Sequence, residues 1–195
     1  MNLINEIRNE VEYRCKQPSN FFGYGCFEHI ESVAFHAVQL AKLYGADQEV
    51  CEIAGWLHDI ASVTDYELYK EHHIHGMDIA EKILKKFNYP QDKIELVKKC
   101  IYNHRGSLDS NRLSLEEVCV ADADAISHYD NIPSLLHLAY VQRKLDIDEG
   151  RQFVKDKLDR SFSKMSSSSK AYYQDKKDMV DLVFGFNPKS IDATR

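Results

Sequence analysis

A histidine and an aspartate, His58 and Asp59, stand side by side in the first third of this chain, within an otherwise apolar stretch that covers residues 55–61. Apolar residues recur at helical spacing from Val50 to Ile60, which predicts a helix facing a core. His58 and Asp59 end this helix about 100° apart around its axis, so both side chains can reach one ion beyond it. A charge near a core needs a partner, and a metal ion is one candidate. A neutral histidine beside a surface carboxylate is the structural alternative.

Further metal-capable side chains occur on apolar helical segments elsewhere in the chain. Seven of the nine histidines lie between positions 29 and 104, so the candidate ligands concentrate in the first half of the sequence. His29 opens a predicted amphipathic helix over residues 29–41, and His104 lies on the apolar face of a helix that starts near Ile94. Asp122 and Asp124 interrupt an almost wholly apolar helical run at 118–126. Aspartates in such a run are expected to have partners.

This order of residues resembles the HD-domain superfamily of metal-dependent phosphohydrolases. The family pattern is a histidine on one helix, a His-Asp pair on a later helix and an aspartate well downstream. The matching positions are His29, His58, Asp59 and Asp124, and the resemblance covers about residues 20 to 130. The Ala-Asp-Ala-Ile context favours Asp124 as the last ligand, and Asp122 is then expected to orient a histidine N–H. Periodicity alone leaves the two open, because this run is apolar on every side.

The resemblance also implies a second metal ion, since some family members add two histidines to the pattern. His72 and His104 occupy the matching positions, although His73 and His75 are close enough to compete with His72. Asp59 would bridge the two ions, because a carboxylate has two oxygens whereas imidazole offers one nitrogen at a time. The donor set suits Fe, Mn, Zn, Co or Ni, as one or two ions, and affinity alone does not identify the metal.

The activity implied by the resemblance is hydrolysis of a phosphoester or phosphoanhydride bond in a small molecule, with a nucleotide as the expected substrate. A metal-activated water would be the nucleophile. Asp59 and Arg105 are the predicted catalytic residues. Asp59 is a metal ligand, and the planar guanidinium group of Arg105 matches the geometry of phosphate oxygens. The alternative interpretation of Arg105 is a solvent-exposed arginine that interacts with the dipole at a helix end. Further candidates for phosphate binding are Lys98, Lys99 and Arg112.

Two other functions share this ligand pattern. One is a non-catalytic helical module in which the metal only stabilises the fold and which serves in signalling or ligand sensing. The other is an oxygenase with a di-iron centre. Retention of every ligand favours the hydrolase, because a binding module could dispense with several of these residues.

The remaining titratable residues have no distinguishing spacing. Three acidic residues after the His-Asp pair are candidate general acids: Asp65, Glu67 and Glu71. His36 lies two turns, roughly 10 Å, from His29, which predicts a core or network histidine rather than a ligand of the same ion. His128 and His137 are predicted to be structural or surface groups.

The elements that carry these residues are predicted to be helical throughout, because helical periodicity dominates and strand alternation is nearly absent. Gly45 and Asp47 supply a helix stop and a helix start before the His-Asp segment. The expected fold is therefore an all-α, HD-domain-like helical bundle. Residues 1–144 would form the phosphohydrolase core, and residues 145–195 a C-terminal helical extension of the same domain, interrupted by the four serines at 166–169.

Composition limits the partners and the compartment. Hydrophobic residues make up 44% of the 195 positions, enough for a sizeable core. The net charge of -6 argues against extended nucleic acid, which requires a basic surface. No stretch of 18 apolar residues and no basic, apolar N-terminal leader is present, which predicts a cytoplasmic protein without a membrane partner. The oligomeric state stays open, with a homo-oligomer among the possibilities.

The five cysteines are odd in number and form no C-x-x-C motif. Neither a disulfide framework nor a thiolate zinc site is predicted from this spacing. We expect all five to be reduced residues of the core.

Overall fold

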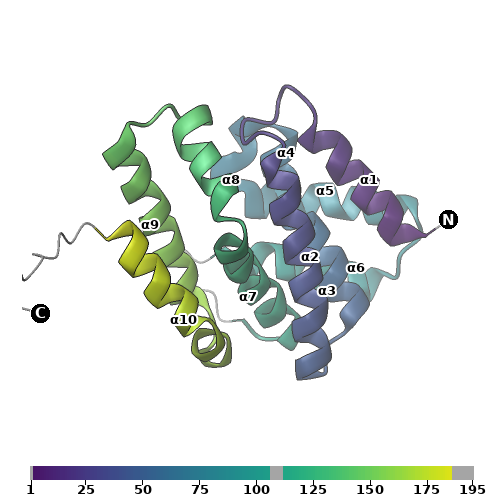
Figure 1. Cartoon of the computed structure of the whole chain (residues 1–195). Helices are drawn as coiled ribbons and strands as arrows, with labels where there is room; N and C mark the ends of the chain where they lie inside the picture. Colours follow the sequence, from purple (N-terminus) through teal and green to yellow (C-terminus); the bar gives the residue numbers. More distant parts are fainter. Residues whose placement is uncertain (1, 106–111, 186–195) are drawn as a thin grey trace, which may run out of the picture.

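The computed structural model describes residues 2–105 and 112–185, and within those ranges every regular element is helical (Figure 1). The predicted all-α fold is confirmed for these residues. The last ten positions of the predicted extension, 186–195, lie outside the described residues. The elements follow in chain order, with η1 a 3-10 helix and η2 a π-helical turn: α1 (Leu3–Cys15), α2 (Gly25–Tyr44), α3 (Gln48–Leu57), α4 (Ile60–Thr64), η1 (Tyr66–Glu71), α5 (His72–Lys86), α6 (Gln91–Asn103), α7 (Leu115–Asp130), α8 (Ile132–His137), η2 (Leu138–Gln142), α9 (Ile147–Lys164) and α10 (Ser167–Phe184).

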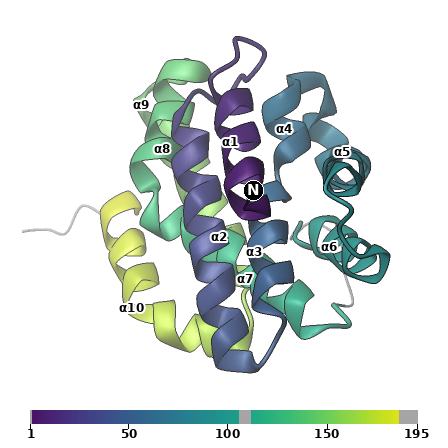
Figure 2. The same ribbon diagram turned by 90° about the vertical axis from the view of Figure 1, so that its right-hand side faces the viewer.

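Helix α2 lies at the centre of the structure and packs against both α3 and α7 (Figure 2). Gly55 of α3 faces the backbone of α2 so closely that an added Cβ would lie 2.7 Å from Cα of Ala34. Only glycine permits this approach without moving one helix. The close packing brings the end of α3, with its histidine, beside the first turns of α2.

The predicted helix stop at Gly45 and helix start at Asp47 are confirmed, but the helix ends before the His-Asp pair, and Ile60, which was expected on the same helix, begins the next one. Gly45 ends α2 in the left-handed conformation with a φ of 75°, and the Asp47 carboxylate accepts a hydrogen bond from the backbone N–H of Val50 at 3.1 Å. Helix α3 stops at Leu57 and α4 starts at Ile60, so His58 and Asp59 occupy the junction between two helices. Side chains at such a junction can point beyond both helix ends.

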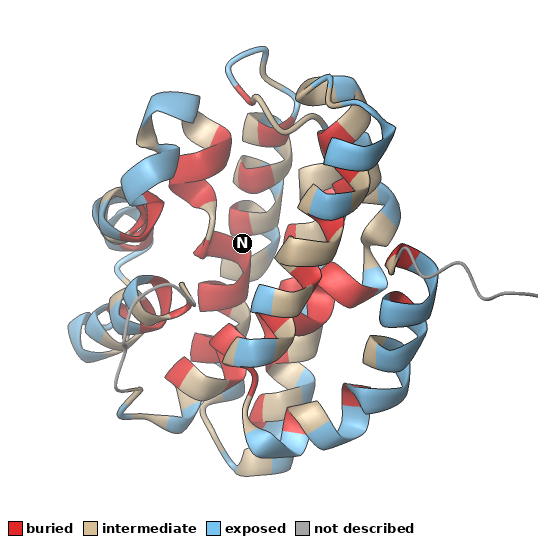
Figure 3. Ribbon diagram, turned by 90° about the vertical axis from the view of Figure 1, so that its left-hand side faces the viewer, coloured by how far each residue is buried: buried red, intermediate tan, exposed pale blue. Residues whose placement is uncertain are grey.

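Two apolar clusters form the interior, and α7 contributes to both of them. The larger cluster joins α1 to α7 and includes Val120, whereas the second joins α7 to α8, η2, α9 and α10 and includes Ile126. Buried residues follow the inward faces of these helices (Figure 3). Burial of each such aliphatic side chain stabilises the fold by roughly 1.5–3 kcal/mol. Helix α7 is packed on nearly every side, and this explains why its sequence is apolar on nearly every side.

The C-terminal helices lie against α7 and against each other (Figure 1). Helix α9 begins with a capping box, in which Asp146 accepts from the N–H of Glu149 at 2.8 Å and Glu149 accepts from the N–H of Asp146. The Ser166 hydroxyl caps α10 by accepting a hydrogen bond from the backbone N–H of Ser169 at 3.3 Å, so the four-serine segment starts a helix. None of the helices in the described ranges combines the length and apolarity needed to cross a membrane.

Candidate metal centre

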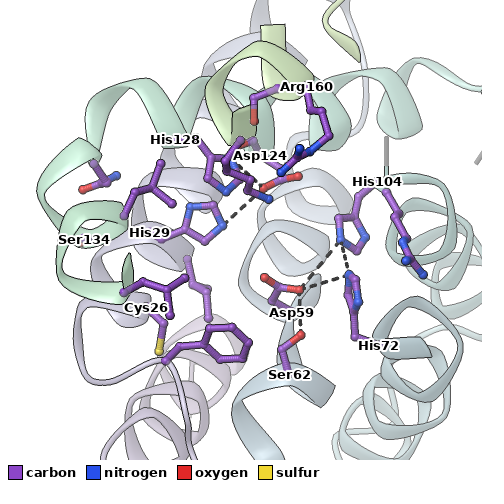
Figure 4. A pocket seen from close by; sticks show the side chains of 18 of the residues that line it. Cys26, His29, Asp59, Ser62, His72, His104, Asp124, His128, Ser134 and Arg160 are labelled. Carbon is purple, nitrogen blue, oxygen red and sulfur yellow. Dashed lines mark hydrogen bonds and ion pairs between the residues drawn. The ribbon is translucent and has the colours of Figure 1, made fainter. Parts of the chain in front are cut away.

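The predicted ligands converge on one cavity of about 750 Å³ from five separate parts of the chain (Figure 4). Each comes from a different place in the fold: His29 from α2, His58 and Asp59 from the α3–α4 junction, His72 from α5, His104 from the end of α6, and Asp124 from α7. All of them line the cavity except His58, which is fully buried behind Asp59. Residues up to 95 positions apart in sequence thus meet in a single site.

A first group of donors forms around His58. Its Nε2 lies 3.6 Å from Oδ2 of Asp59 and 3.9 Å from Oδ1 of Asp124. Nε2 of His29 lies 3.3 Å from the same oxygen of Asp124. Donor atoms of His29, His58 and Asp59 all lie within 4.8 Å of one another, a spacing that a single ion can span.

A second group forms around the other oxygen of Asp59. Oδ1 lies 3.5 Å from Nε2 of His72 and 3.9 Å from Nε2 of His104, and these two nitrogens are 3.2 Å apart. Asp59 therefore directs Oδ2 toward the first group and Oδ1 toward the second. The two oxygens of one carboxylate thus face two different groups of donors.

Backbone carbonyls fix the orientation and tautomer of the imidazoles. Three rings donate Nδ1–H to the carbonyl oxygen three residues earlier: His58 to Gly55 at 2.8 Å, His72 to Tyr69 at 2.8 Å, and His104 to Ile101 at 2.5 Å. His29 places its Nδ1 2.9 Å from the Ser127 hydroxyl oxygen, while that hydroxyl donates to the His29 carbonyl. With Nδ1 protonated, each neutral ring directs the lone pair of Nε2 at the cavity.

The donor atoms fit a metal ion better than they fit one another. Nε2 of His58 is buried and has no hydrogen-bond partner within residues 2–105 and 112–185. The facing nitrogens of His72 and His104 both carry lone pairs, so neither donates to the other in this tautomer. One cation in each of the two donor groups would give all three nitrogens a partner.

Electrostatics keep these residues in the protonation states that bind metal. Burial lowers the pKa of His58 and of His104, which leaves both rings neutral. Burial alone would raise the pKa of Asp59, but the neighbouring histidines, when they carry a proton, outweigh it and the pKa falls. For Asp124 the Lys164 ammonium outweighs burial, and the pKa lies well below its ordinary value. Neutral imidazoles and ionised carboxylates are the forms that metal binding requires.

Comparison with known sequences agrees with this geometry. Residues 26–129, more than half of the chain, match the HD domain family. The chain belongs to the HD-domain family. The predicted membership of this superfamily of metal-dependent phosphohydrolases is therefore confirmed.

Curated relatives share this HD domain over about half of the chain. Ribonuclease Y of Clostridium kluyveri is 35% identical over 106 residues, which are 54% of this chain and 19% of that protein. Ribonuclease Y of Helicobacter pylori is 29% identical over 102 residues, 52% of this chain and 18% of that protein. An uncharacterized protein of Clostridium beijerinckii is 29% identical over 120 residues, 57% of this chain and 76% of that protein. The chain therefore spans about a fifth of the Ribonuclease Y relatives that it matches.

Solved structures resemble the HD domain protein over nearly its whole length. A protein from Lactobacillus plantarum has a TM-score of 0.67 at 17% identity, with 93% of both chains covered. Bacillus subtilis YpgQ, solved in complex with ADP, has a TM-score of 0.63 at 18% identity, covering 92% of this chain and 93% of that one. At these identities the likeness shows a common fold, which includes the C-terminal helices.

His128 belongs to the wall of the cavity, contrary to its prediction as a structural or surface group. It is buried, its ring centroid lies 4.5 Å from that of His29, and its Nδ1 donates to the Asp124 carbonyl at 2.8 Å. Its donor atoms also group with those of His29 and Asp124. The sequence contained one signal, because His128 follows Asp124 by four residues and lies on the same helical face.

Asp122 does not orient a histidine, and that prediction is wrong. Its carboxylate accepts hydrogen bonds from the backbone N–H of Ser166 at 2.9 Å, from the Ser166 hydroxyl at 2.5 Å and from the Ser169 hydroxyl at 2.7 Å. Helical positions two apart project about 200° from each other, so Asp122 faces the start of α10 while Asp124 faces the cavity. Asp122 and Asp124 thus both have partners, as their buried positions required.

The opposite wall of the cavity consists of three cations on α9, which the sequence did not identify. Lys157, Arg160 and Lys164 follow at i, i+3 and i+7 and line the cavity together. Lys164 pairs with Oδ2 of Asp124 and lies 3.3 Å from the His104 carbonyl. Lys157 and Arg160 have no hydrogen-bond or ion-pair partner in the part of the chain that the structure describes. Figure 4 shows Arg160 reaching toward Asp124.

Of the cations that the sequence proposed for phosphate, only Arg105 lines the cavity. Its Nη1 donates to the Lys70 carbonyl at 2.8 Å and lies 3.3 Å from Nδ1 of His73. Lys98 pairs instead with Glu81 at 2.7 Å. The other two candidates, Lys99 and Arg112, also lie outside the lining. Arg105 thus keeps its predicted place, whereas Lys98 has another partner and Lys99 is exposed.

The structure separates the remaining candidates as well. Of the three clustered histidines only His72 reaches Asp59, because His73 contacts Arg105 and His75 is partly exposed. None of the predicted general acids lines the cavity: Asp65, Glu67 and Glu71. His36 lies 2.7 Å from Asp130, as expected for a network histidine, and His137 is exposed.

Proposed function

We propose that this HD domain hydrolyses a phosphoester or phosphoanhydride bond of a small phosphorylated molecule, with a nucleotide as the substrate. The observation that carries the proposal is the sharing of one cavity by a His-Asp metal cluster and the unpaired cations of α9. A divalent metal and free cationic side chains both attract phosphate oxygens.

The metal would be held by residues already described as two groups. The first ion would use His29, His58, Asp59 and Asp124, and a second would use Asp59, His72 and His104. Fe, Mn, Zn, Co and Ni all suit this mixture of imidazole and carboxylate. When bound, such an ion polarises a phosphoryl oxygen and lowers the pKa of a coordinated water toward neutrality.

The chain's own residues bind and orient the substrate. Lys157 and Arg160 are free to donate to phosphate oxygens that enter the cavity, and Arg105 adds a third donor from the opposite side. Lys164 holds Oδ2 of Asp124, which keeps Oδ1 directed at His29 and His58. Lys164 is therefore assigned to positioning the carboxylate of a metal ligand. Lys157 and Arg160 are assigned to binding the substrate phosphate.

The other end of the cavity suits a nucleobase. Its lining is apolar and aromatic apart from a few polar groups near Ser134: Phe22, Cys26, Ile30, Leu135, Leu138 and Phe153. Figure 4 places Cys26 and Ser134 away from His72 and His104. A cavity of about 750 Å³ is of the size that encloses small ligands, commonly ~300–1,000 Å³. The ADP complex of YpgQ, which shares the fold, supports a nucleotide as the first ligand to test.

RNA is the second candidate substrate, because the curated relatives named Ribonuclease Y are up to 35% identical over the matched segment. The net charge of -6 disfavours an extended polyanion bound along the surface. A single nucleotide needs only the local cations of the cavity. We therefore place the small-molecule substrate first.

The test is a phosphate- and pyrophosphate-release screen on chelator-treated protein reloaded with Mn, Fe, Co, Ni or Zn. Nucleoside mono-, di- and triphosphates are compared with a short oligoribonucleotide under the same conditions. Asp59→Asn should abolish release. Asp148→Asn, the same change on a side chain that is 89% exposed, should leave it intact.

The screen separates the candidate functions. Release from nucleotides that requires Asp59 supports the proposal. Cleavage of the oligoribonucleotide with no release from nucleotides would move the function to RNA. Tight nucleotide binding by calorimetry without turnover in any metal would support the non-catalytic sensing module instead.

A further inference from the structure

Two cysteines outside the set of metal ligands meet beside the cavity, and one of them, Cys26, lines it. Cys15 ends α1 and Cys26 lies in the first turn of α2, and their sulfur atoms are 3.4 Å apart. Both are free thiols in this structure. A disulfide requires sulfur atoms ~2.05 Å apart, so a side-chain adjustment of about 1.4 Å would join them.

The segment between these cysteines is arranged around the pair. The Asn20 amide nitrogen lies within hydrogen-bond distance of Sγ of Cys26 (3.3 Å), the Cys15 carbonyl (2.8 Å) and the Gly23 carbonyl (3.1 Å). Asn20 is itself buried. One side chain thus fixes the ends of the loop that separates α1 from α2 and places the two thiols together.

The two thiols differ in access. Cys26 lines the cavity and is partly exposed, whereas Cys15 lies behind it and is 2% exposed. Cys26 packs against the main apolar cluster, as predicted, but it is only partly buried, unlike the other four cysteines. A small reagent that enters the cavity can reach Cys26 first and cannot reach Cys15 directly.

We propose that Cys15 and Cys26 form a thiol–disulfide redox site, with Cys26 as the thiol that attacks a low-molecular-weight disulfide and Cys15 as the thiol that resolves it. This inference does not rest on the proposed hydrolase function. Position in the first turn of a 20-residue helix favours the Cys26 thiolate. Hydrogen bonds from Cys15 and Asn20 likewise lower the pKa of Cys26.

The chemistry is a two-electron exchange in two steps. The Cys26 thiolate attacks one sulfur of the small disulfide, which breaks its S–S bond, forms a mixed disulfide on Cys26 and releases one small thiolate. Cys15 then loses its proton and attacks Sγ of Cys26, which forms the Cys15–Cys26 bond and releases the second small thiolate. Two protein thiols are oxidised and one small disulfide is reduced to two thiols.

The remaining cysteines provide an internal control. Cys51, Cys100 and Cys119 are each fully buried in the main apolar cluster and do not line the cavity. A reagent that reaches Cys26 through the cavity should leave these three unmodified in the folded protein. Their reaction would indicate unfolding rather than a defined site.

A Cys15–Cys26 disulfide would affect the cavity as well as the loop between α1 and α2. Cys26 precedes His29 by one turn of α2, so a link to α1 fixes the first turn of the helix that carries a metal ligand. It also draws the Cys26 sulfur toward α1 and away from the apolar end. Closing this short loop should raise the midpoint of thermal unfolding by a few degrees, because it restricts the unfolded chain.

The experiment uses the full chain, oxidised glutathione and tryptic mass mapping after thiol alkylation without reductant. The expected product joins the peptide Cys15-Lys16 to the peptide 17–42, and dithiothreitol reverses it. Cys15→Ser should stop at the mixed disulfide and retain one glutathione on Cys26. Cys26→Ser should take up none, while a far-UV spectrum confirms that both variants are folded.

Three results would overturn the proposal. One is wild-type protein that forms no Cys15–Cys26 link at a glutathione excess sufficient to modify an unfolded control. Another is a Cys15→Ser variant without glutathione on Cys26. The third is modification of Cys51, Cys100 or Cys119 at the same rate as Cys26. None of these readouts depends on hydrolysis, so failure here and failure of the proposed function are distinguishable.

Discussion

The two facing walls of the cavity are built in different ways. The metal wall takes its residues from α2 through α7, and most of its imidazoles are held by their own Nδ1 hydrogen bonds to nearby carbonyls. The cationic wall takes its residues from α9 alone, and two of its three cations have no partner among the described residues. The first wall is fixed before any ligand arrives, whereas the second keeps donors available for one.

This difference assigns separate tasks to the two walls. Donors that converge within 4.8 Å with locked tautomers are suited to holding an ion in defined geometry. Unpaired lysine and arginine side chains at the cavity edge are suited to phosphate groups of variable length. We therefore expect changes in the metal wall to alter turnover and metal content, and changes in the cationic wall to alter substrate affinity.

The largest effect is expected from Asp124→Asn, which alters the metal wall. Loss of a ligand should reduce turnover by more than about 100-fold, because even an orienting partner of a ligand is typically worth 10–100-fold. Steady-state kinetics with the best nucleotide and metal measure this change. Asp122→Asn is the matched control on the same helix, and a larger loss of turnover in that variant would contradict the assignment.

A smaller effect on a different parameter is expected from Lys157→Ala and Arg160→Ala. Each substitution removes one charged hydrogen-bond donor to phosphate. Such a hydrogen bond contributes about 1.5–3 kcal/mol, so KM should rise by roughly 10–100-fold while the metal content stays unchanged. Lys155→Ala is the control on the same helix, since Lys155 pairs with Asp159 at 2.7 Å and does not line the cavity. An unchanged KM in both test variants would remove α9 from substrate binding.

Asp122→Asn should instead affect stability. Asp122 is fully buried and accepts three hydrogen bonds at the start of α10, so its replacement should lower the free energy of unfolding by about 1–2 kcal/mol. Urea unfolding followed by far-UV circular dichroism measures the loss. Equal stability of wild type and variant would show that the α7–α10 contact contributes little.

The smallest effect concerns the attachment of α10 to the core through Asp130. Burial alone would raise the pKa of this carboxyl, but hydrogen bonds from His36 and Lys176 outweigh it and lower the pKa below 3.8. A lowered pKa in the folded state stabilises the protein fully above the unfolded value and loses that contribution as pH falls through the folded value. Asp130→Asn should therefore cost about 1 kcal/mol at pH 7 and less at pH 3.

Urea unfolding of wild type and Asp130→Asn at the two pH values tests this sign. Asp148→Asn is the control at pH 7, because an exposed ion pair contributes little. A difference that grows as the pH falls would contradict the account of Asp130.

Much of the metal wall could be predicted from sequence, because the order of its residues and their helical context resemble the HD-domain pattern. His29, His58, Asp59, His72, His104 and Asp124 were proposed as ligands, and the structure brings all six together; their binding of metal stays a prediction. Helix α7 was the exception. Its two apolar clusters surround it, so periodicity could not separate Asp122 from Asp124 or show that His128 faces the cavity.

The cationic wall could not be predicted, for a different physical reason. Lys157, Arg160 and Lys164 share a helical face, but charged faces usually meet solvent. Only the packing of α9 on α7 brings this face to the cavity, and that packing is a long-range contact. The same limit applies to the cysteines, because Cys15 and Cys26 meet through the fold of the intervening loop around Asn20.

The most direct test of the account is the metal content of purified, reloaded protein measured by inductively coupled plasma mass spectrometry. The account predicts near two ions per chain in wild type and in Lys157→Ala, near one in His104→Ala, and loss of most of the metal in His58→Ala. Retention of the wild-type metal content by both histidine variants would contradict the assignment of this cavity as a metal centre.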